Sequence, residues 1–265
     1  MGKDVQAMLF AIDIGNTNLT IGLYDKQKLI FLARLATDTR RTAEQYALEL
    51  NQIAALDKKS MSAVTGAIIS SVVPELTGVL KRAVFLLTGI VPAILGPGLK
   101  SGLNIKIDNP AQLGADLVAG AVAAVNRFEM PCLIMDLGTA TKISVLDAEG
   151  NYRGCTISAG VSLSLNALAG SAAQLPSVNL DVENCPAYGT NTVSSMQAGI
   201  ILGTASMLDG LCDRIEAELG EPVKTVVATG GLAGDITKHC KRRPVYEPNL
   251  VLDGLRIVYE KNLRQ

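Results

Sequence analysis

Two stretches of the chain share one order of apolar and polar positions. The first is an apolar run at residues 8–12, followed by an aspartate, a glycine-containing turn and an alternating pattern at residues 19–24. The second begins at residue 131, where an apolar run leads to Asp136, a glycine, a threonine and again an alternating segment. This order is typical of a strand, a tight turn and a returning strand. Its repetition predicts two similar lobes, one in each half of the chain.

The rest of the chain alternates short apolar runs with longer segments of helical period. Strands are predicted at residues 28–35, 66–72, 93–95, 152–158, 223–228 and 244–246. Helices are predicted at residues 43–56, 74–87, 109–125, 161–169, 193–219 and 253–263, with a further one that ends near residue 240. Strands that alternate with helices indicate an α/β fold. We expect one lobe at residues 8–127 and the other at residues 128–265.

The composition narrows the function classes. Hydrophobic residues make up 48% of the 265 residues, which is ample for a core in one large domain or two close-packed lobes. With 24 basic and 25 acidic residues, no net charge directs the protein to nucleic acid or to an anionic membrane. The five cysteines are scattered without a CxxC pair and His239 is the single histidine, which argues against a zinc site, a disulfide framework and a Ser-His-Asp triad.

Localisation follows from the same features. Residues 1–7 lack the apolar core of a signal peptide, and no apolar run reaches transmembrane length. Together with the unpaired cysteines, this predicts a cytoplasmic protein without a membrane partner.

The two turns are candidate phosphate loops. Gly15 lets the backbone turn where a side chain would block it, and the amides of residues 15–18 with the Thr17 hydroxyl can then point at an anion. Asp13 can hold, usually through water, the Mg²⁺ that accompanies a nucleotide. Taken alone, the first turn is equally compatible with an ordinary hairpin and an Asx-type turn. Its recurrence at Asp136 favours the phosphate loop.

A third glycine-containing signal lies near the C-terminus. A β-branched strand ends in Gly230 and Gly231, ahead of a helix, and paired glycines allow a flat ring to lie against the backbone. These three pieces, in this order, resemble the actin, hexokinase and Hsp70 nucleotide-binding fold, in which two ribonuclease-H-like lobes flank a cleft. There the two turns bind phosphates and the glycine pair binds adenosine. The resemblance implies ATP binding by Asp13, Ile14, Gly15, Asn16, Thr17, Asn18, Thr139, Gly230 and Gly231.

Within that superfamily the chain is most similar to the type III pantothenate kinases, over nearly its whole length. The asparagine after Gly15 and the compact length carry the similarity, together with three further motifs. These are Gly114-Ala115-Asp116 for the family's Gly-x-Asp-Arg, Leu175-Pro176 for Thr-Ala-x-Leu-Pro, and the segment that ends at Thr192. The resemblance implies ATP-dependent phosphorylation of pantothenate, the first step of coenzyme A biosynthesis. It also implies a homodimer, Mg²⁺, and a K⁺ or NH₄⁺ ion held by Asp136.

Asp116 is the candidate general base. It is the only charged residue between positions 111 and 125 of a predicted helix, and a carboxylate there is costly unless it is paired or hydrated. It therefore either caps a neighbouring element or faces a cleft and takes part in chemistry. The resemblance favours the second, because the family's aspartate accepts the proton of the substrate's primary hydroxyl.

Two threonines also allow a structural and a functional interpretation. Arg41-Thr42-Ala43-Glu44 resembles the family's Arg-Thr-x-x-Glu element, but a helix capping box with Thr42 as the cap explains it as well and is favoured. Thr192 matches a threonine that contacts the substrate in the family, and as a plain N-cap it would need no ligand. The resemblance implies a substrate site formed by Gly114, Ala115, Asp116, Leu117, Thr192 and Ile107.

The differences from the family lie on the substrate side. Leu117 replaces an arginine, Ile107 a tyrosine, Ala172 a threonine and Lys142 a threonine, and residues 154–160 differ from Gly-Gly-x-Ile-x-Pro-Gly. An arginine that binds a carboxylate or hydroxyl contributes about 1.5–3 kcal/mol. Pantothenate recognition is therefore weak, rebuilt by other residues, or absent. The Lys142 ammonium either reaches Asp136 and stands where the monovalent cation would bind, or is exposed on a hairpin.

Three interpretations remain. The first is a type III pantothenate kinase with a variant pocket. The second is a paralogous kinase that phosphorylates another primary alcohol through Asp116. The third is an ATP-binding accessory or regulatory protein without turnover, against which the retained Asp116 argues.

Overall fold

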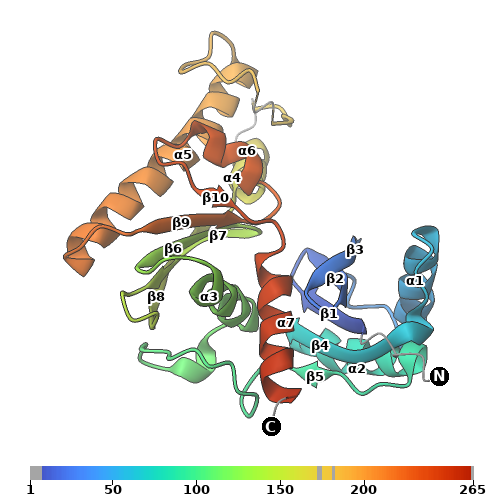
Figure 1. The fold of residues 1–265 in the computed structure, drawn as a ribbon. Helices are drawn as coiled ribbons and strands as arrows, with labels where there is room; N and C mark the ends of the chain where they lie inside the picture. Colours follow the sequence, from blue (N-terminus) through green and yellow to red (C-terminus); the bar gives the residue numbers. More distant parts are fainter. Residues whose placement is uncertain (1–7, 172–174, 181–182, 264–265) are drawn as a thin grey trace. The chain divides into compact units, whose positions relative to one another are not determined.

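The computed structural model describes residues 8–171, 175–180 and 183–263, which form two compact units (Figure 1). Unit 1 contains the described residues up to 102, residues 109–123 and those from 250 onward. Unit 2 contains residues 103–108 and 124–249. Ala172, one of the substrate-side differences, lies outside the described residues.

Unit 1 is built on a five-stranded sheet with the order β3-β2-β1-β4-β5. The strands are β1 (Met8–Ile14), β2 (Asn18–Asp25), β3 (Lys28–Ala36), β4 (Val64–Ser71) and β5 (Ala93–Ile94). The first three form an antiparallel meander, and β4 and β5 continue the sheet in parallel with β1. Covered on both faces, β1 is a nearly continuous apolar run, as central strands are.

Helices cover both faces of this first sheet. The helices α1 (Ala43–Leu56) and α2 (Pro74–Thr88) bury Phe10, Ile12 and Ile14 of β1 on one face. On the other face α7 (Leu250–Leu263) packs against β1, β2 and β4 (Figure 1). This packing is close, because a Cβ on Gly66 of β4 would overlap the ring of Tyr259. Two short 3₁₀ turns, η1 (Met61–Ala63) and η2 (Pro110–Gln112), complete the unit with the start of α3 (Ala115–Arg127).

Unit 2 repeats the same sheet. Its strands are β6 (Cys132–Leu137), β7 (Ala140–Leu146), β8 (Tyr152–Ala159), β9 (Thr225–Thr229) and β10 (Val245–Tyr246). The order β8-β7-β6-β9-β10 has an antiparallel meander followed by two parallel strands, as in unit 1. The helical elements are α4 (Val161–Ser171), α5 (Thr192–Leu219), α6 (Ala233–Ile236) and the 3₁₀ turn η3 (Thr237–His239). The prediction of an α/β fold with two similar lobes is therefore confirmed.

The units differ from the two contiguous ranges expected, 8–127 and 128–265. The reason is α7, which comes last in the chain but packs on the sheet of unit 1. A pattern of apolar positions shows that this helix has a buried face, but not which sheet covers it.

Among the described residues, none of the helices is both long and apolar enough to cross a membrane.

Candidate active site

The first turn has the geometry of a compact backbone loop. The Gly15 amide donates to the Asn18 carbonyl at 3.0 Å, which closes the turn between β1 and β2. A Cβ on Gly15 would lie 3.0 Å from that same oxygen, so a side chain would crowd the turn. Asn16, Thr17 and Asn18 are exposed. The turn thus presents polar groups to solvent, as expected of a loop that binds an anion.

Ile14 contributes differently from its neighbours. Its side chain is fully buried in the core of unit 1, and its carbonyl accepts a hydrogen bond from the Val72 amide at 3.0 Å. Ile14 was predicted among the ATP-binding residues. Its side chain is part of the core, and it anchors the base of the turn.

Thr37 braces the first turn from outside. Its amide donates to the Thr17 carbonyl at 2.9 Å, and its hydroxyl donates to the Gly15 carbonyl at 2.7 Å. Thr37 follows β3 directly and is 22 residues from Gly15 in the chain, so these hydrogen bonds join segments that are distant in sequence. Thr37 therefore fixes the backbone of the loop at two points.

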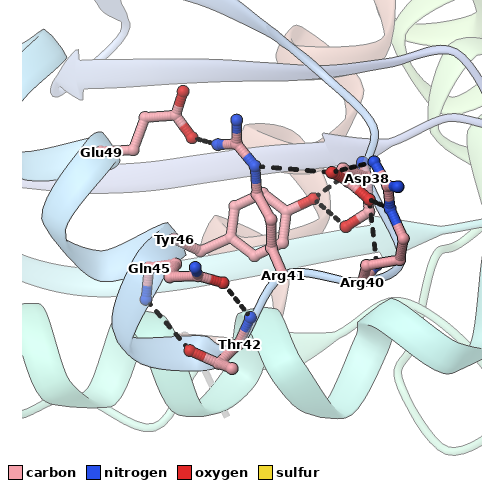
Figure 2. A network of polar contacts seen from close by, with 7 residues as sticks. All are labelled: Asp38, Arg40, Arg41, Thr42, Gln45, Tyr46 and Glu49. Atoms are coloured by element: carbon pink, nitrogen blue, oxygen red, sulfur yellow. Dashed lines mark hydrogen bonds and ion pairs between the residues drawn. The ribbon is translucent and has the colours of Figure 1, made fainter.

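The segment after Thr37 is held by a polar network (Figure 2). The buried Tyr46 hydroxyl accepts from the Asp38 amide at 3.0 Å and donates to the Asp38 carbonyl at 2.9 Å. Arg41 forms ion pairs with Glu49 and with Asp38, the latter at 3.9 Å. Since Asp38 follows Thr37 directly, this network also restrains the brace on the first turn.

Thr42 is the N-cap of α1. Its hydroxyl accepts from the Gln45 amide at 3.3 Å, and the Gln45 side chain accepts from the Thr42 amide at 2.9 Å (Figure 2). This reciprocal pair is a capping box. The favoured structural interpretation of Thr42 is therefore confirmed.

Asp13 is oriented by a residue that the sequence did not single out. The Ser70 hydroxyl donates a short hydrogen bond to Asp13 Oδ1, and Ser70 is fully buried. The two residues lie opposite each other in the parallel pair β1–β4. Charge-assisted hydrogen bonds of this kind are the stronger ones. The signal available in the sequence was a pair of serines that ends an apolar β-branched strand.

Asp116 lies in the first turn of α3, not in the middle of a helix. Pro110 starts only a 3₁₀ turn, Leu113 has an extended conformation (ψ 125°), and the α-helix begins at Ala115. The predicted start at residue 109 was wrong because this break interrupts the pattern. Near a helix N-terminus the amide groups and the macrodipole stabilise a carboxylate. The position of Asp116 in this first turn thus lowers the free-energy cost of placing a carboxylate in an otherwise apolar helix.

Asp116 and the first turn meet the same edge of the sheet in unit 1. A Cβ on Gly114 would lie 2.5 Å from Asp116 Oδ1 and 3.6 Å from the Val72 side chain. Val72 in turn donates to the Ile14 carbonyl at the base of the first turn. A side chain at position 114 would therefore displace the Asp116 carboxylate. The candidate base and the candidate phosphate loop are therefore both at the carboxyl ends of β1 and β4.

The second turn is enclosed by two glycines from other elements. The Gly138 amide donates to the Ala140 carbonyl at 3.2 Å, and Gly138 and Thr139 are exposed. A Cβ on Gly160, at the start of α4, would overlap the Thr139 carbonyl. Gly160 is thus a residue of this site that the sequence analysis did not name. Its signal was a glycine directly ahead of a helix.

Gly230 packs behind the same turn. Its φ is +101°, and a Cβ there would lie 2.6 Å from the carbonyl oxygen of Leu137. Both the conformation and the contact require glycine. Gly231, by contrast, is exposed next to it. The glycine pair and the second turn thus lie together at the carboxyl ends of β9 and β6.

Asp136 is paired with Lys142. The two residues lie directly opposite each other on β6 and β7, and Lys142 Nζ is 2.9 Å from Asp136 Oδ2. Their side chains are 16% and 21% exposed, respectively, so the pair is largely buried. Of the two alternatives for Lys142, the structure supports the ammonium that reaches Asp136.

The predicted substrate residues belong to both units. Gly114, Ala115, Asp116 and Leu117 are half-buried around the start of α3 in unit 1. Ile107 belongs to unit 2, next to Lys106, whose amide donates to the Tyr152 carbonyl at 2.8 Å. Thr192 is exposed in the first turn of α5, where Asn191 and not Thr192 is the N-cap. The N-cap interpretation of Thr192 is therefore wrong by one residue.

The buried cysteines are not nucleophiles. Burial raises the pKa of the Cys132, Cys212 and Cys240 thiols to about 12, so they remain protonated near neutral pH. Among the described residues, no cluster of three His, Cys, Asp or Glu side chains could hold a metal ion by itself. A metal at this site would need ligands from a bound molecule, as Mg²⁺ usually does when it accompanies phosphates.

Solved structures with the same fold define the class of protein. The activator of the 2-hydroxyisocaproyl-CoA dehydratase from Clostridium difficile superposes with a TM-score of 0.58 at 12% identity, covering 97% of this chain and 98% of that one. Component A of the (R)-2-hydroxyglutaryl-CoA dehydratase from Acidaminococcus fermentans gives 0.57 at 14% identity, covering 98% and 100%. The fold is that of the actin, hexokinase and Hsp70-like ATPases.

Sequence relatives identify the family within that class. A sequence model of the type III pantothenate kinases matches residues 9–214. Two proteins described as type III pantothenate kinase, from Exiguobacterium sibiricum and Geobacter sulfurreducens, are each 40% identical over 255 residues. The matches cover 96% of this chain and 100% and 99% of those proteins. The chain belongs to the type III pantothenate kinase family.

Proposed function

We propose that this chain transfers the γ-phosphoryl group of ATP to the primary hydroxyl of pantothenate, with Asp116 as the general base. Family membership supports the reaction. The observation that carries the assignment of the base is the position of Asp116. It lies in the first turn of α3 with Oδ1 close to Gly114, and Gly114 adjoins Val72 at the sheet edge where the first phosphate loop also begins.

Asp116 removes the proton from the hydroxyl that attacks the γ-phosphate. Phosphoryl transfer requires alignment of the reactants, neutralisation of charge and a base, with little covalent chemistry. A base acts mainly in the transition state, so its loss lowers turnover much more than nucleotide binding. Gly114 leaves room for the Asp116 carboxylate, because a Cβ at this position would lie 2.5 Å from Oδ1.

Each of the two turns is a proposed contact for the ATP phosphates. Residues Gly15, Asn16, Thr17 and Asn18 offer the polar groups of the first turn, and Thr139 offers those of the second. Asp13, held by Ser70, is the residue that would hold Mg²⁺, through water. Bound Mg²⁺ neutralises charge on the phosphates. A single oriented carboxylate fits this ion, because the phosphates and water supply its remaining ligands.

The adenosine lies against Gly230 and Gly231. Gly230 is fixed behind the second turn by its contact with Leu137, while Gly231 is exposed and lacks a side chain. A flat ring can approach such a backbone closely. The contact of Gly230 with Leu137, the last residue of β6 before the second turn, supports this assignment.

Residues 114–117 of unit 1 are the proposed acceptor contacts, and the resemblance adds Ile107 and Thr192 of unit 2. Leu117 takes the place of an arginine, and it cannot donate a charge-assisted hydrogen bond to the substrate. Pantothenate recognition therefore depends more on the remaining contacts. This difference favours, as a second candidate, a kinase that phosphorylates another small primary alcohol with the same base.

We also propose a cytoplasmic homodimer. The five cysteines are free, as is usual in the reducing cytoplasm, and coenzyme A biosynthesis is expected in the same compartment. Exposed Tyr188 and Val193 flank Thr192 at the start of α5 and provide apolar surface for a second copy. The mass in solution, measured by light scattering, tests this assignment.

The experiment that tests the function is ADP release by the purified protein with Mg·ATP, with and without pantothenate. Asp116→Asn removes the base with little change in shape. We expect pantothenate-dependent release by the unaltered protein and a loss of several orders of magnitude in the variant, with ATP affinity retained. ATP binding without pantothenate-dependent release would refute the proposal and direct the search to other primary alcohols.

A further inference from the structure

A fixed positive charge lies at the base of the second turn. Lys142 Nζ contacts Asp136 Oδ2 at 2.9 Å, across the β6–β7 pair. The other carboxylate oxygen of Asp136 is the side-chain atom that a Cβ on Gly138 would meet first, at 3.5 Å. The ammonium is thus held by a carboxylate that adjoins the glycine of the turn. The turn itself is the proposed phosphate contact.

An ion pair between strands has an ordinary structural explanation. Opposite charges directly across a sheet contribute about 0.2–1 kcal/mol, which helps a hairpin to form. Lys238 and Asp235 form such a pair at 3.2 Å, with side chains 60% and 44% exposed. The Lys142–Asp136 pair differs because it is largely buried. There the charges are desolvated and salt screens them weakly.

A separate monovalent cation does not fit beside this pair. Asp136 is the carboxylate to which the family resemblance assigns K⁺ or NH₄⁺, but it already carries a cation of this chain. Two unit charges 4 Å apart repel each other by about 4 kcal/mol at the effective dielectric near a protein surface. For a second cation, that repulsion cancels most of the attraction to the one carboxylate, which Lys142 already neutralises. The charge of Asp136 is therefore already neutralised by a cation of this chain.

We propose that the Lys142 ammonium replaces the monovalent cation, so that this enzyme needs neither added K⁺ nor added NH₄⁺. The inference rests on the proposed function, in which the second turn holds phosphate. The lysine ammonium group carries the same charge as K⁺ and NH₄⁺ and is chemically similar to NH₄⁺. It can donate three hydrogen bonds. Because Lys142 is part of β7, its ammonium group stays at the site whatever salts the solution contains.

The test compares the unaltered protein with Lys142→Thr, which restores the family's residue. Pantothenate-dependent ADP release is measured with KCl and with tetramethylammonium chloride at equal ionic strength. We expect the unaltered protein to be equally active in both salts. The variant should lose about tenfold or more in tetramethylammonium and regain activity in K⁺. Lys142→Gln removes the charge and keeps a longer polar side chain than threonine. It should show the same loss and recovery, and it serves as the second variant if Lys142→Thr does not fold.

Lys238→Thr is the matched control. It removes a lysine from an exposed pair with an aspartate, 3.2 Å apart, away from the turn. Its activity should be the same as that of the unaltered protein in both salts. Any general effect of losing a lysine would appear in this control as well.

Ion binding gives a second readout that does not depend on turnover. Binding of Tl⁺, which has the charge of K⁺ and a similar size, is followed by thallium NMR, and the effect of K⁺ on Tm is measured alongside. We expect binding and a K⁺-dependent rise in Tm for the Lys142 variants only. Strong K⁺ activation or Tl⁺ binding by the unaltered protein would overturn the inference, as would variants indifferent to K⁺ in both readouts. Absence of pantothenate turnover in every sample would contradict the proposed function, while Tl⁺ binding still decides the role of Lys142.

Discussion

The contact between Ser70 and Asp13 yields the sharpest prediction. Ser70→Ala removes one hydroxyl from a fully buried site and leaves a void of a single oxygen atom. The lost interaction is a hydrogen bond to a carboxylate, and such bonds contribute about 1.5–3 kcal/mol. At about 1.4 kcal/mol for each factor of ten, the expected loss is roughly tenfold to 150-fold.

Where this loss appears depends on the role of Asp13. If the carboxylate positions Mg²⁺ for the nucleotide, kcat/KM for Mg·ATP should fall by that factor, and the Mg²⁺ concentration for half-maximal activity should rise. If Asp13 has only a structural role, the loss should appear in the unfolding free energy instead. Steady-state kinetics across a Mg²⁺ titration, together with urea unfolding, separates the two.

The neighbouring serine is the matched control. The Ser71 hydroxyl donates to the Val73 carbonyl and accepts from Thr77, so it stabilises the start of α2 and does not contact Asp13. Ser71→Ala should therefore lower stability while the Mg·ATP kinetics stay unchanged. Equal kinetic losses in both variants, or unchanged kinetics in Ser70→Ala, would refute the positioning role of Ser70.

Two further predictions concern unit 2. Gly230→Ala places a methyl group 2.6 Å from the Leu137 carbonyl at a φ of +101°. We therefore expect weaker ATP binding in calorimetry and a lower Tm. An unaltered ATP affinity would contradict the role of Gly230 in the adenosine site. Arg242→Met should lower the unfolding free energy at neutral pH by about 1–3 kcal/mol, because Arg242 donates to Glu216 at 2.9 Å in a half-buried contact. Hydrogen bonds from Arg242 hold the pKa of Glu216 below its usual value. The pair therefore contributes fully above the unfolded pKa of Glu216, about 4.3, and its contribution is lost as the pH falls through the folded pKa. The difference between variant and unaltered protein should shrink in acid, and a constant difference in urea titrations would exclude this linkage.

The sequence was sufficient where the determining contacts are local. An apolar strand, an aspartate and a glycine turn are adjacent in the chain, so both turns could be predicted, and so could the capping box at Thr42. The contact between Lys142 and Asp136 could also be predicted, because a tight turn places the two residues opposite each other in one hairpin.

Contacts between distant segments could not be predicted in this way. The parallel pairing that brings Ser70 to Asp13 spans 57 residues, and no periodicity specifies its register. The packing of Gly160 on the second turn depends on the direction in which β8 enters α4. For Asp116, proline was correctly taken as a helix signal, but the extended Leu113 delays the α-helix to Ala115. The position of α7 on unit 1 was missed for the same reason, since it depends on a sheet formed at the other end of the chain.

The position of α7 has a consequence for how the protein is made. Ribosomes release the chain from its N-terminus, and domains formed early in the sequence generally fold first. Here the sheet of unit 1 is synthesised first, but α7, which covers β1, β2 and β4 with Leu252, Leu255 and Val258, is synthesised last. One apolar face of that sheet therefore stays uncovered until α7 has been synthesised. Most of unit 2 is a single continuous segment, and it leaves the ribosome complete before the first lobe can close.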